Sequence, residues 1–208
     1  MAETMIASDM TDGQIDDLAN KLRDAARKHR NEVSKDVAQQ VLGADNLGMR
    51  LFVIFRQLAE AISNMIVRHV KVDRTKTPEQ ILEATGRRQY VDANVVKNMP
   101  KGDENEGDIY FFKPSAETYD ENGLISDDNL EKEFELRGLK PVDPYKLSQF
   151  NADGPAFADE KPHGTHWKNA DGQWCFATFY RWHGRRSVDV DGLGDDWGAF
   201  WWFAGLRK

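Results

Sequence analysis

The first seventy residues carry a helical pattern of apolar positions. Between residues 11 and 42 the apolar side chains recur at intervals of three and four, which is the period of one face of an α-helix. Thr11 or Asp12 suits the N-cap and Gly43 suits the stop, so the pattern predicts one helix over 11–42. The members of this seam are Ile15, Leu18, Leu22, Ala25, His29, Val33, Val37 and Val41.

A second seam alternates steps of four and three in the manner of a heptad repeat. It runs through Leu51, Phe55, Leu58, Ile62, Met65 and His69. Two interpretations stay open for residues 1–70: a helical hairpin or bundle that forms homo-oligomers, or two amphipathic helices folded onto their own domain. The second is favoured by extra apolar positions that widen the stripe beyond a two-stranded seam, namely Phe52, Ile54, Ala59 and Ile66.

After residue 70 the spacing of apolar residues no longer follows one long helix, and the predicted helices and strands are short. Val70–Val72 and 108–112 have the composition of strands. Four further apolar segments each follow a helix-start signal. An N-cap side chain accepts from a backbone N–H of the first turn, and a proline in that turn has no N–H that needs a partner. These signals lie at Thr77-Pro78, Asp92, Ser126 and Pro144. Short strands mixed with short helices predict an α+β domain over 71–208.

All six tryptophans fall within the last 42 residues, at Trp167, Trp174, Trp182, Trp197, Trp201 and Trp202. Asn169–Gly172 predicts a hairpin turn between aromatic strands at 165–167 and 173–180, and 201–204 predicts another strand. The polar, glycine-punctuated stretch 185–196 is expected to be exposed. Packed aromatic strands beside a polar segment are typical of binding surfaces, because the scaffold stays rigid while the polar segment contacts the ligand.

The net charge of the chain, and the absence of a recognisable targeting pattern, limit the classes of partner that we expect. A net charge of −7 and a pI near 5.3 argue against nucleic acid, whose phosphates require clustered cations. No stretch resembles a signal peptide or a membrane-spanning helix. We expect a cytoplasmic protein when synthesised, with virion or surface association left open because assembly into a particle needs no signal.

Metal and catalytic patterns are weak. Glu160, His163 and His166 match no zinc spacing, and the aspartates near 189–196 lack the ordered spacing of an EF-hand. The sequence has no nucleophile-elbow pattern, and its single cysteine, Cys175, forms no internal disulfide. We therefore expect no metal, no cofactor and no enzyme activity.

Residues 75–208 resemble the C-type-lectin-fold variable proteins of diversity-generating retroelements, which occur in phages, archaeal viruses and uncultured bacteria. The resemblance lies in Glu131–Pro141, Gly164–Trp167 and Trp202–Lys208; the Gly-Gly-Ser-Trp signature of some members is absent. It implies a C-type-lectin-like domain whose last strands lie near its opening strand. It also implies a hypervariable region in which adenine-directed mutagenesis exchanges surface side chains and spares the buried scaffold.

The alternation in Ser187–Asp191 fits that implication, since a strand would turn two valines inward and three polar side chains outward. Tryptophan codons are not reached by adenine replacement at an asparagine-type codon, so Trp182, Trp197, Trp201 and Trp202 are expected to be scaffold. Trp182 also belongs to the candidate ligand-binding set because tyrosine, tryptophan and arginine dominate recognition surfaces. The full set is Tyr180, Trp182, His183, Arg185, Arg186, Ser187, Asp189, Asp191, Leu193, Asp195, Ala199 and Phe200.

The resulting functional prediction is a non-enzymatic protein whose C-terminal surface binds a macromolecular ligand, with protein as the expected class. One alternative is a phage-encoded inhibitor whose acidic clusters at 103–106 and 127–128 occupy a basic site on a host protein. Another is a lectin-fold relative of the formylglycine-generating enzymes that lacks their cysteine pair. Stoichiometric capture of one host protein would favour the inhibitor.

Overall fold

The computed structural model describes residues 10–192 and 196–208, apart from the side chains of Gln57 and Glu60. The chain divides into two compact units, residues 1–54 and 55–208. This division falls inside a helix, α3 (Leu47–Ser63), earlier in the chain than the expected boundary at residue 70. Among the described residues, no helix is long and apolar enough to span a membrane.

The first unit contains α1 (Asp12–Lys28), α2 (Lys35–Leu42) and the first turns of α3. The Thr11 hydroxyl accepts from the N–H of Gln14, and the Gln14 side chain accepts from the N–H of Thr11. The two bonds form a capping box. A single helix over 11–42 was the wrong prediction. The helix ends after Lys28, and the Ser34 hydroxyl accepts from the N–H of Val37 to begin a new one, because serine offers the backbone a cap in place of a continued turn.

The second seam also crosses a change of structure. α3 ends at Ser63 and a strand, β1 (Ile66–Lys71), follows at once. β1 pairs antiparallel with β3 (Glu106–Phe112), with Ile66 opposite Phe111. The prediction that His69 extends the helical seam is therefore wrong, because pairing with a strand distant in sequence outweighs the local apolar spacing.

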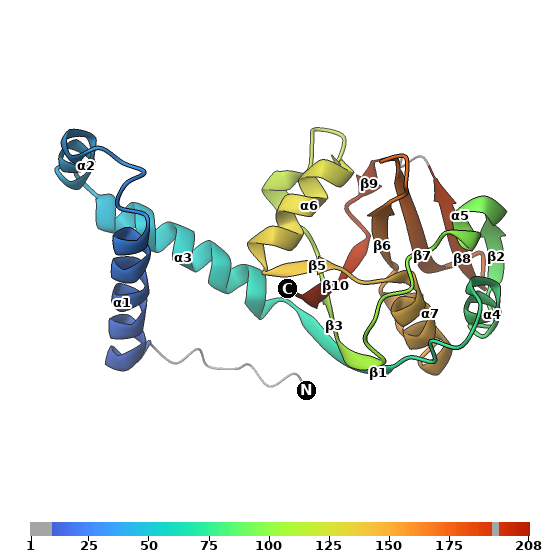
Figure 1. The fold of residues 1–208 in the computed structure, drawn as a ribbon. Helices are drawn as coiled ribbons and strands as arrows, with labels where there is room; N and C mark the ends of the chain where they lie inside the picture. The colour runs from blue at the N-terminus through green and yellow to red at the C-terminus, as the bar shows by residue number, and fades with distance from the viewer. Residues whose placement is uncertain (1–9, 193–195) are drawn as a thin grey trace, which may run out of the picture. The chain divides into compact units, whose positions relative to one another are not determined.

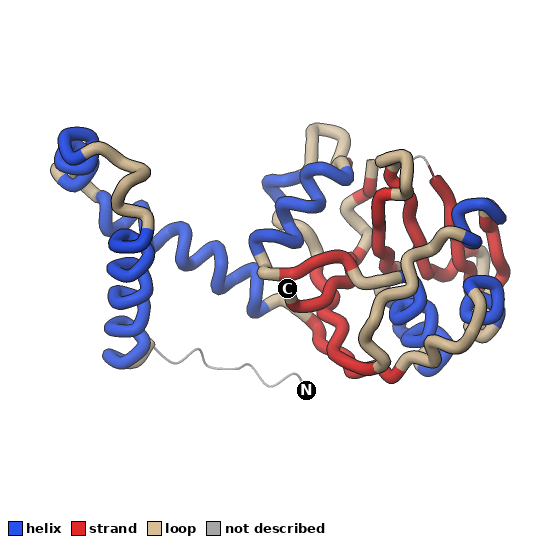
Figure 2. The backbone as a smooth tube through the Cα atoms, viewed as in Figure 1, coloured by secondary structure: helices blue, strands red, loops and turns tan. Residues whose placement is uncertain are grey.

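The second unit is built around one large mixed sheet with strand order β1-β3-β10-β6-β7-β8-β2 (Figures 1 and 2). The last strand, β10, lies next to β3, so a single strand separates it from the opening strand β1. The unit is α+β, as predicted. The remaining strands of this order are β10 (Trp202–Arg207), β6 (His163–Lys168), β7 (Trp174–Trp182), β8 (Arg185–Gly192) and β2 (Arg88–Val91).

Four helices begin where the sequence signals placed them. These are α4 (Pro78–Glu83), α5 (Ala93–Lys97), α6 (Asp127–Leu136) and α7 (Pro144–Asp153). The sequence missed several short elements, namely β2, β4 (Leu124–Ile125), β5 (Leu139–Pro141), the 3₁₀ turn Ala116–Thr118, α8 (Phe157–Glu160) and β9 (Trp197–Gly198). β5 pairs with β10, and β4 pairs with β9 in a small second sheet.

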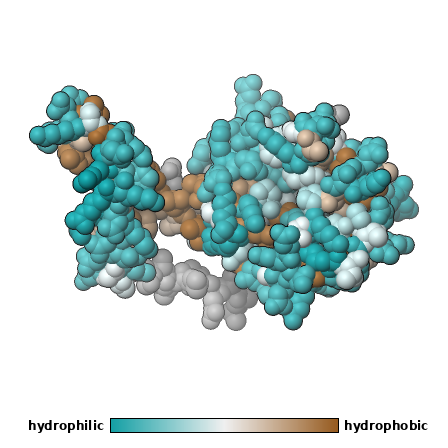
Figure 3. Space-filling model, viewed as in Figure 1, coloured by the Kyte–Doolittle hydropathy of each residue, from teal (hydrophilic) through white to brown (hydrophobic). Residues whose placement is uncertain are grey.

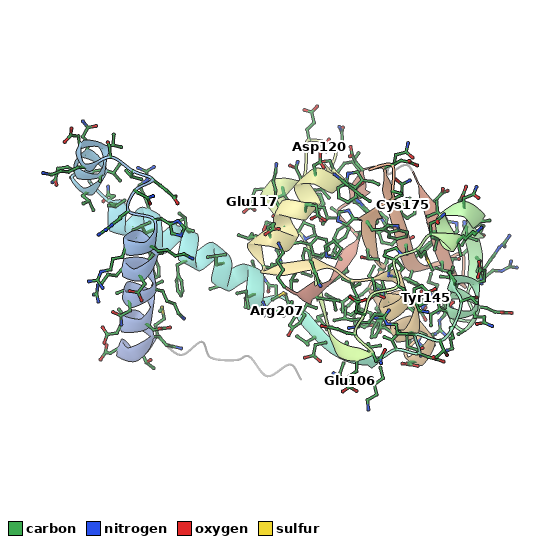
Figure 4. All side chains as sticks on the ribbon, in the orientation of Figure 1. Glu106, Glu117, Asp120, Tyr145, Cys175 and Arg207 are labelled. Carbon is green, nitrogen blue, oxygen red and sulfur yellow. The ribbon has the colours of Figure 1, made fainter. Side chains whose placement is uncertain are left out.

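The two faces of the large sheet have different covers. On one face α4, α5 and α7 pack on Ala177, Phe179, Val188 and Val190 to form the larger core; Tyr145 of α7 and Cys175 of β7 are labelled in Figure 4. On the other face Leu130 and Phe134 of α6 pack with Trp197 and Phe203. This second core includes neither β8 nor β2, so the outward side chains of these strands have no helix above them.

Candidate functional site

The part of the sheet that no helix covers is formed by β7, β8 and β2, and we call it the open face. The register pairs Thr178 with Asp189 and Asp189 with Tyr90, so these three residues form a row across the strands. Because paired residues share a side of a sheet, the row defines which residues face outward. The open face comprises Tyr90, Phe176, Thr178, Tyr180, Trp182, Arg185, Ser187, Asp189 and Asp191.

Two indoles border the open face. The Trp197 ring meets Phe176 edge-on at 5.7 Å between centroids, and the Trp201 ring meets Tyr180 edge-on at 5.8 Å. Gly164 of β6 makes this possible, because a Cβ there would lie 3.2 Å from the Trp197 ring and 2.9 Å from the Thr178 methyl group. The missing side chain lets an indole lie directly against the sheet.

The indoles and the strands enclose a cavity of about 280 Å³. An adjoining hollow of about 390 Å³ extends over β2 and shares Phe176, Asp189 and Asp191 with it. The cavity is lined by Phe176, Thr178, Asp189, Asp191, Asp196, Trp197 and Trp201. Its walls therefore alternate between aromatic rings and carboxylates.

A part-buried hydrogen bond holds the Asp189 carboxylate in this site. The Tyr180 hydroxyl donates to the Asp189 carboxylate, at 2.9 Å from each oxygen. Burial raises the pKa of Asp189, and the nearby charge of Asp191 acts in the same direction. Burial likewise raises the pKa of the Tyr180 hydroxyl, assisted by its bond to Asp189. The pair holds a carboxylate at the base of the cavity with a neutral partner.

The candidate ligand-binding residues differ in how far the structure exposes them to solvent. Tyr180 and Asp189 are half-buried, while Ser187 is only 2% exposed, so its expected outward exposure was wrong. Val188 and Val190 are fully buried, as predicted. Leu193 and Asp195 lie outside the described residues. The exposed members are Trp182, His183, Arg185, Asp191, Ala199 and Phe200.

Two further expectations need correction. Trp182 is 64% exposed and so is not a packed scaffold indole. Arg186 pairs with Arg181 on the side of the sheet opposite the open face, where its guanidinium Nη2 lies 2.8 Å from the Asp159 carboxylate. The stretch 185–192 is a sheet strand rather than a loop, which is why alternate residues in it have opposite environments.

Sequence reasoning missed half of the site. Tyr90 and Asp92 come from β2 and the residue after it, and β2 joins β8 by parallel pairing. The only local signal was a short aromatic and β-branched pair between Gly86 and Asp92. Phe176 and Thr178 belong to the strand that was predicted to be buried; Thr178 is buried and Phe176 half-buried, and the sequence did not show that both line a cavity.

The histidines do not form a metal site. His163 and His166 lie on opposite sides of β6, and among the described residues no group of three histidine, cysteine or acidic side chains could hold a metal ion. Burial lowers the pKa of His163 to about 3. Burial also raises the pKa of the Cys175 thiol, which disfavours the thiolate needed for nucleophilic chemistry.

A larger cavity of about 780 Å³ lies away from the open face, between α6, β5, β6 and the 100–104 loop. The buried His166 ring borders it. Its Nδ1 contacts Asp127 and its Nε2 lies 2.8 Å from Glu131. With a carboxylate close to each nitrogen, this ring acts as an ionic link between α6 and the sheet.

Comparison of the chain with models of protein families, with curated proteins and with solved structures finds no match.

Proposed function

We propose that this chain is a non-enzymatic binding protein and that the open face, with the adjoining β7–β8 turn and residues 199–200, recognises a protein ligand. The observation that carries the proposal is a sheet face without a covering helix, which has an acidic cavity and, on the face or next to it, exposed aromatic side chains. Trp182 is 64% exposed and Phe200 59% exposed. Large aromatic side chains exposed beside polar groups are the usual anchors of protein recognition.

We further propose that the second unit is a C-type-lectin-like scaffold whose exposed C-terminal side chains are diversified. In support, the scaffold under these side chains is fully packed, since Phe179, Val188, Val190 and Phe203 have no exposed surface. Exchange of an exposed neighbour leaves this packing intact. Sequencing the adjacent DNA tests diversification: a reverse transcriptase gene and a near-duplicate of the 3′ end support it, and their absence rejects it.

Recognition at the open face is tested by selecting binders from a random peptide library against the full chain. We expect Trp182→Ala to weaken the selected binders at least about tenfold, because exposed tryptophans carry much of an interface's binding energy. Asp171→Asn, in the hairpin turn between β6 and β7, is the control and should leave affinity unchanged. Binders that bind both variants equally well would place recognition elsewhere.

The first unit supplies a means of association. None of its described side chains is buried, and apolar residues along its helices remain about half exposed, including Ile15, Leu22, Val37, Val41 and Met49. Figure 3 shows brown, apolar surface at α2, whereas the visible surface of the second unit is mainly hydrophilic. We propose that these helices join copies of the chain, which would raise avidity for a repeated ligand.

This assembly role predicts a change of mass in solution. Val37→Lys together with Val41→Lys places two charges on the apolar face of α2, and burying them between copies would cost several kcal/mol. We expect light scattering to show the wild type above its chain mass of 23.8 kDa and the double variant at that mass. Gln39→Lys on the same helix is the control. A wild type that already has the chain mass rejects the role.

A further inference from the structure

The cavity on the open face has a composition that specifies its ligand, and this inference deepens the proposed function on which it rests. At about 280 Å³ the cavity lies at the lower end of the range of small-molecule sites, which is about 300–1,000 Å³. A volume of this size suits a single side chain projecting from a larger partner.

Negative charge gathers around the cavity without neutralisation. Asp189, Asp191 and Asp196 line it, and Asp92 borders the adjoining hollow. Within 10–192 and 196–208 none of these four carboxylates forms an ion pair, and Asp189 is bonded to a neutral hydroxyl. The nearby guanidinium of Arg186 is held by Asp159 on the other side of the sheet. A cation entering the cavity would therefore meet the exposed carboxylates of Asp191 and Asp196 and the half-buried carboxylate of Asp189, whose attraction water screens less.

The remaining walls are aromatic. Phe176, Trp197 and Trp201 line the same cavity, and Trp197 and Trp201 stand perpendicular to each other at 6.0 Å between centroids. Aromatic faces attract cations, and tryptophan does so most strongly. A planar guanidinium stacks on such rings and donates up to five hydrogen bonds in its plane, whereas an ammonium is a compact and strongly hydrated point charge.

A hydroxyl in the cavity wall provides an independent indication of a missing partner. Thr178 is only 3% exposed and lines the cavity, yet its hydroxyl makes no hydrogen bond to any part of the chain that the structure describes. The oxygen itself is not fully buried, so it can accept from an N–H group that enters the cavity. No described group of three acidic, histidine or cysteine side chains meets the requirements of a metal ion, which favours an organic cation.

We propose that this cavity receives the guanidinium of an arginine side chain presented by a protein partner. The carboxylates of Asp189 and Asp191 accept its N–H groups, the Thr178 hydroxyl accepts another, and the indoles of Trp197 and Trp201 pack against its plane. This assigns a charge class to the partner, namely a surface on which an arginine projects from a basic region, complementary to the net charge of −7 of this chain.

The test uses the full chain labelled with ¹⁵N and follows its indole N–H resonances by NMR. The probe is N-acetyl-arginine methylamide, with the citrulline analogue as a neutral control of the same shape and the lysine analogue as a second cation. We expect saturable shifts of the Trp197 and Trp201 signals with a Kd on the order of millimolar, since a lone side chain offers few contacts. The citrulline and lysine analogues should bind at least about tenfold and threefold more weakly.

Two variants locate the binding. Asp191→Asn removes one exposed carboxylate and should weaken arginine binding about tenfold, while Asp171→Asn, a matched change outside the cavity, should leave it unchanged. Equal binding of citrulline, tighter binding of lysine, no saturable shift, or no effect of Asp191→Asn overturns the proposal.

The library selection separates this proposal from the proposed function. Binders that require the open face but contain no essential arginine overturn the arginine pocket and leave the recognition face standing. Binding of the arginine probe without any library binder at that face supports the pocket and rejects protein recognition there.

Discussion

Replacing Arg87 by alanine is expected to destabilise the second unit by about 3–5 kcal/mol. Arg87 is 6% exposed, and its guanidinium donates to the carbonyl oxygens of Tyr180 and Pro155 and to the side chain of Asn151. Burial lowers the pKa of Arg87 to about 10, so the charge is retained at neutral pH. Its removal leaves three acceptors unpaired and a gap beside Phe179, over which the guanidinium lies.

The measurement is urea unfolding followed by tryptophan fluorescence, which reports on the second unit because all six tryptophans lie there. Arg88→Ala is the matched control, since the neighbouring arginine is exposed and its guanidinium lies over the Tyr90 ring. A loss of at most about 1 kcal/mol is expected for it. If both variants lost the same stability, Arg87 would not organise the base of the β7–β8 hairpin.

Replacing His166 by glutamine is expected to cost about 3–5 kcal/mol at pH 6 and less at higher pH. The buried ring lies between the carboxylates of Asp127 and Glu131, and Asp127 also accepts from the Trp197 indole at 2.8 Å. Burial by itself would lower the pKa of His166, but the bonds and charges of the two carboxylates outweigh it and raise that pKa.

This pKa shift sets the direction of the pH dependence. The stabilising charge is fully present below the unfolded pKa of about 6.5 and is lost as pH rises through the higher folded pKa. Wild-type stability should therefore fall with pH from about 6.5 upward, relative to His166→Gln, by up to about 1.4 kcal/mol per pH unit.

Urea unfolding at a series of pH values from 6 to 9 measures this difference. His69→Gln removes an exposed histidine of β1 and is expected to keep the wild-type slope. Parallel curves for the wild type and His166→Gln would contradict an imidazolium link between α6 and the sheet. The link matters for the open face because Asp127 holds the Trp197 indole that borders the cavity.

Helix starts and the hairpin turn could be predicted from the sequence, because the groups that form them lie within a few residues of each other. The capping boxes at Thr11 and Thr77 form between residues three apart. The turn between β6 and β7 closes through a bond from the N–H of Asn169 to the carbonyl of Gln173, and Gly172 takes the positive φ of +78° that such turns favour in glycine. Helix starts, this hairpin and the α+β class all follow from such neighbours.

The alternation of β8 was also readable in part. Two buried valines between polar residues indicate a strand, and that much is confirmed. The same pattern gives Ser187 and Asp191 equivalent positions, yet Ser187 is buried and Asp191 exposed. Burial along one side of a strand depends on what lies over it, and that cover comes from elsewhere in the chain.

The sequence by itself determined which part of the chain carries the candidate binding residues. The tryptophans and the strand of alternating valine and polar residues both lie near its C-terminal end. Only the tertiary structure decided which side chains form the site. Tyr90 reaches Asp189 by parallel pairing of strands about a hundred residues apart, and Gly164 admits Trp197 onto the sheet. Register and close packing arise from contacts between distant segments, and these contacts have no local signature that a single sequence can display.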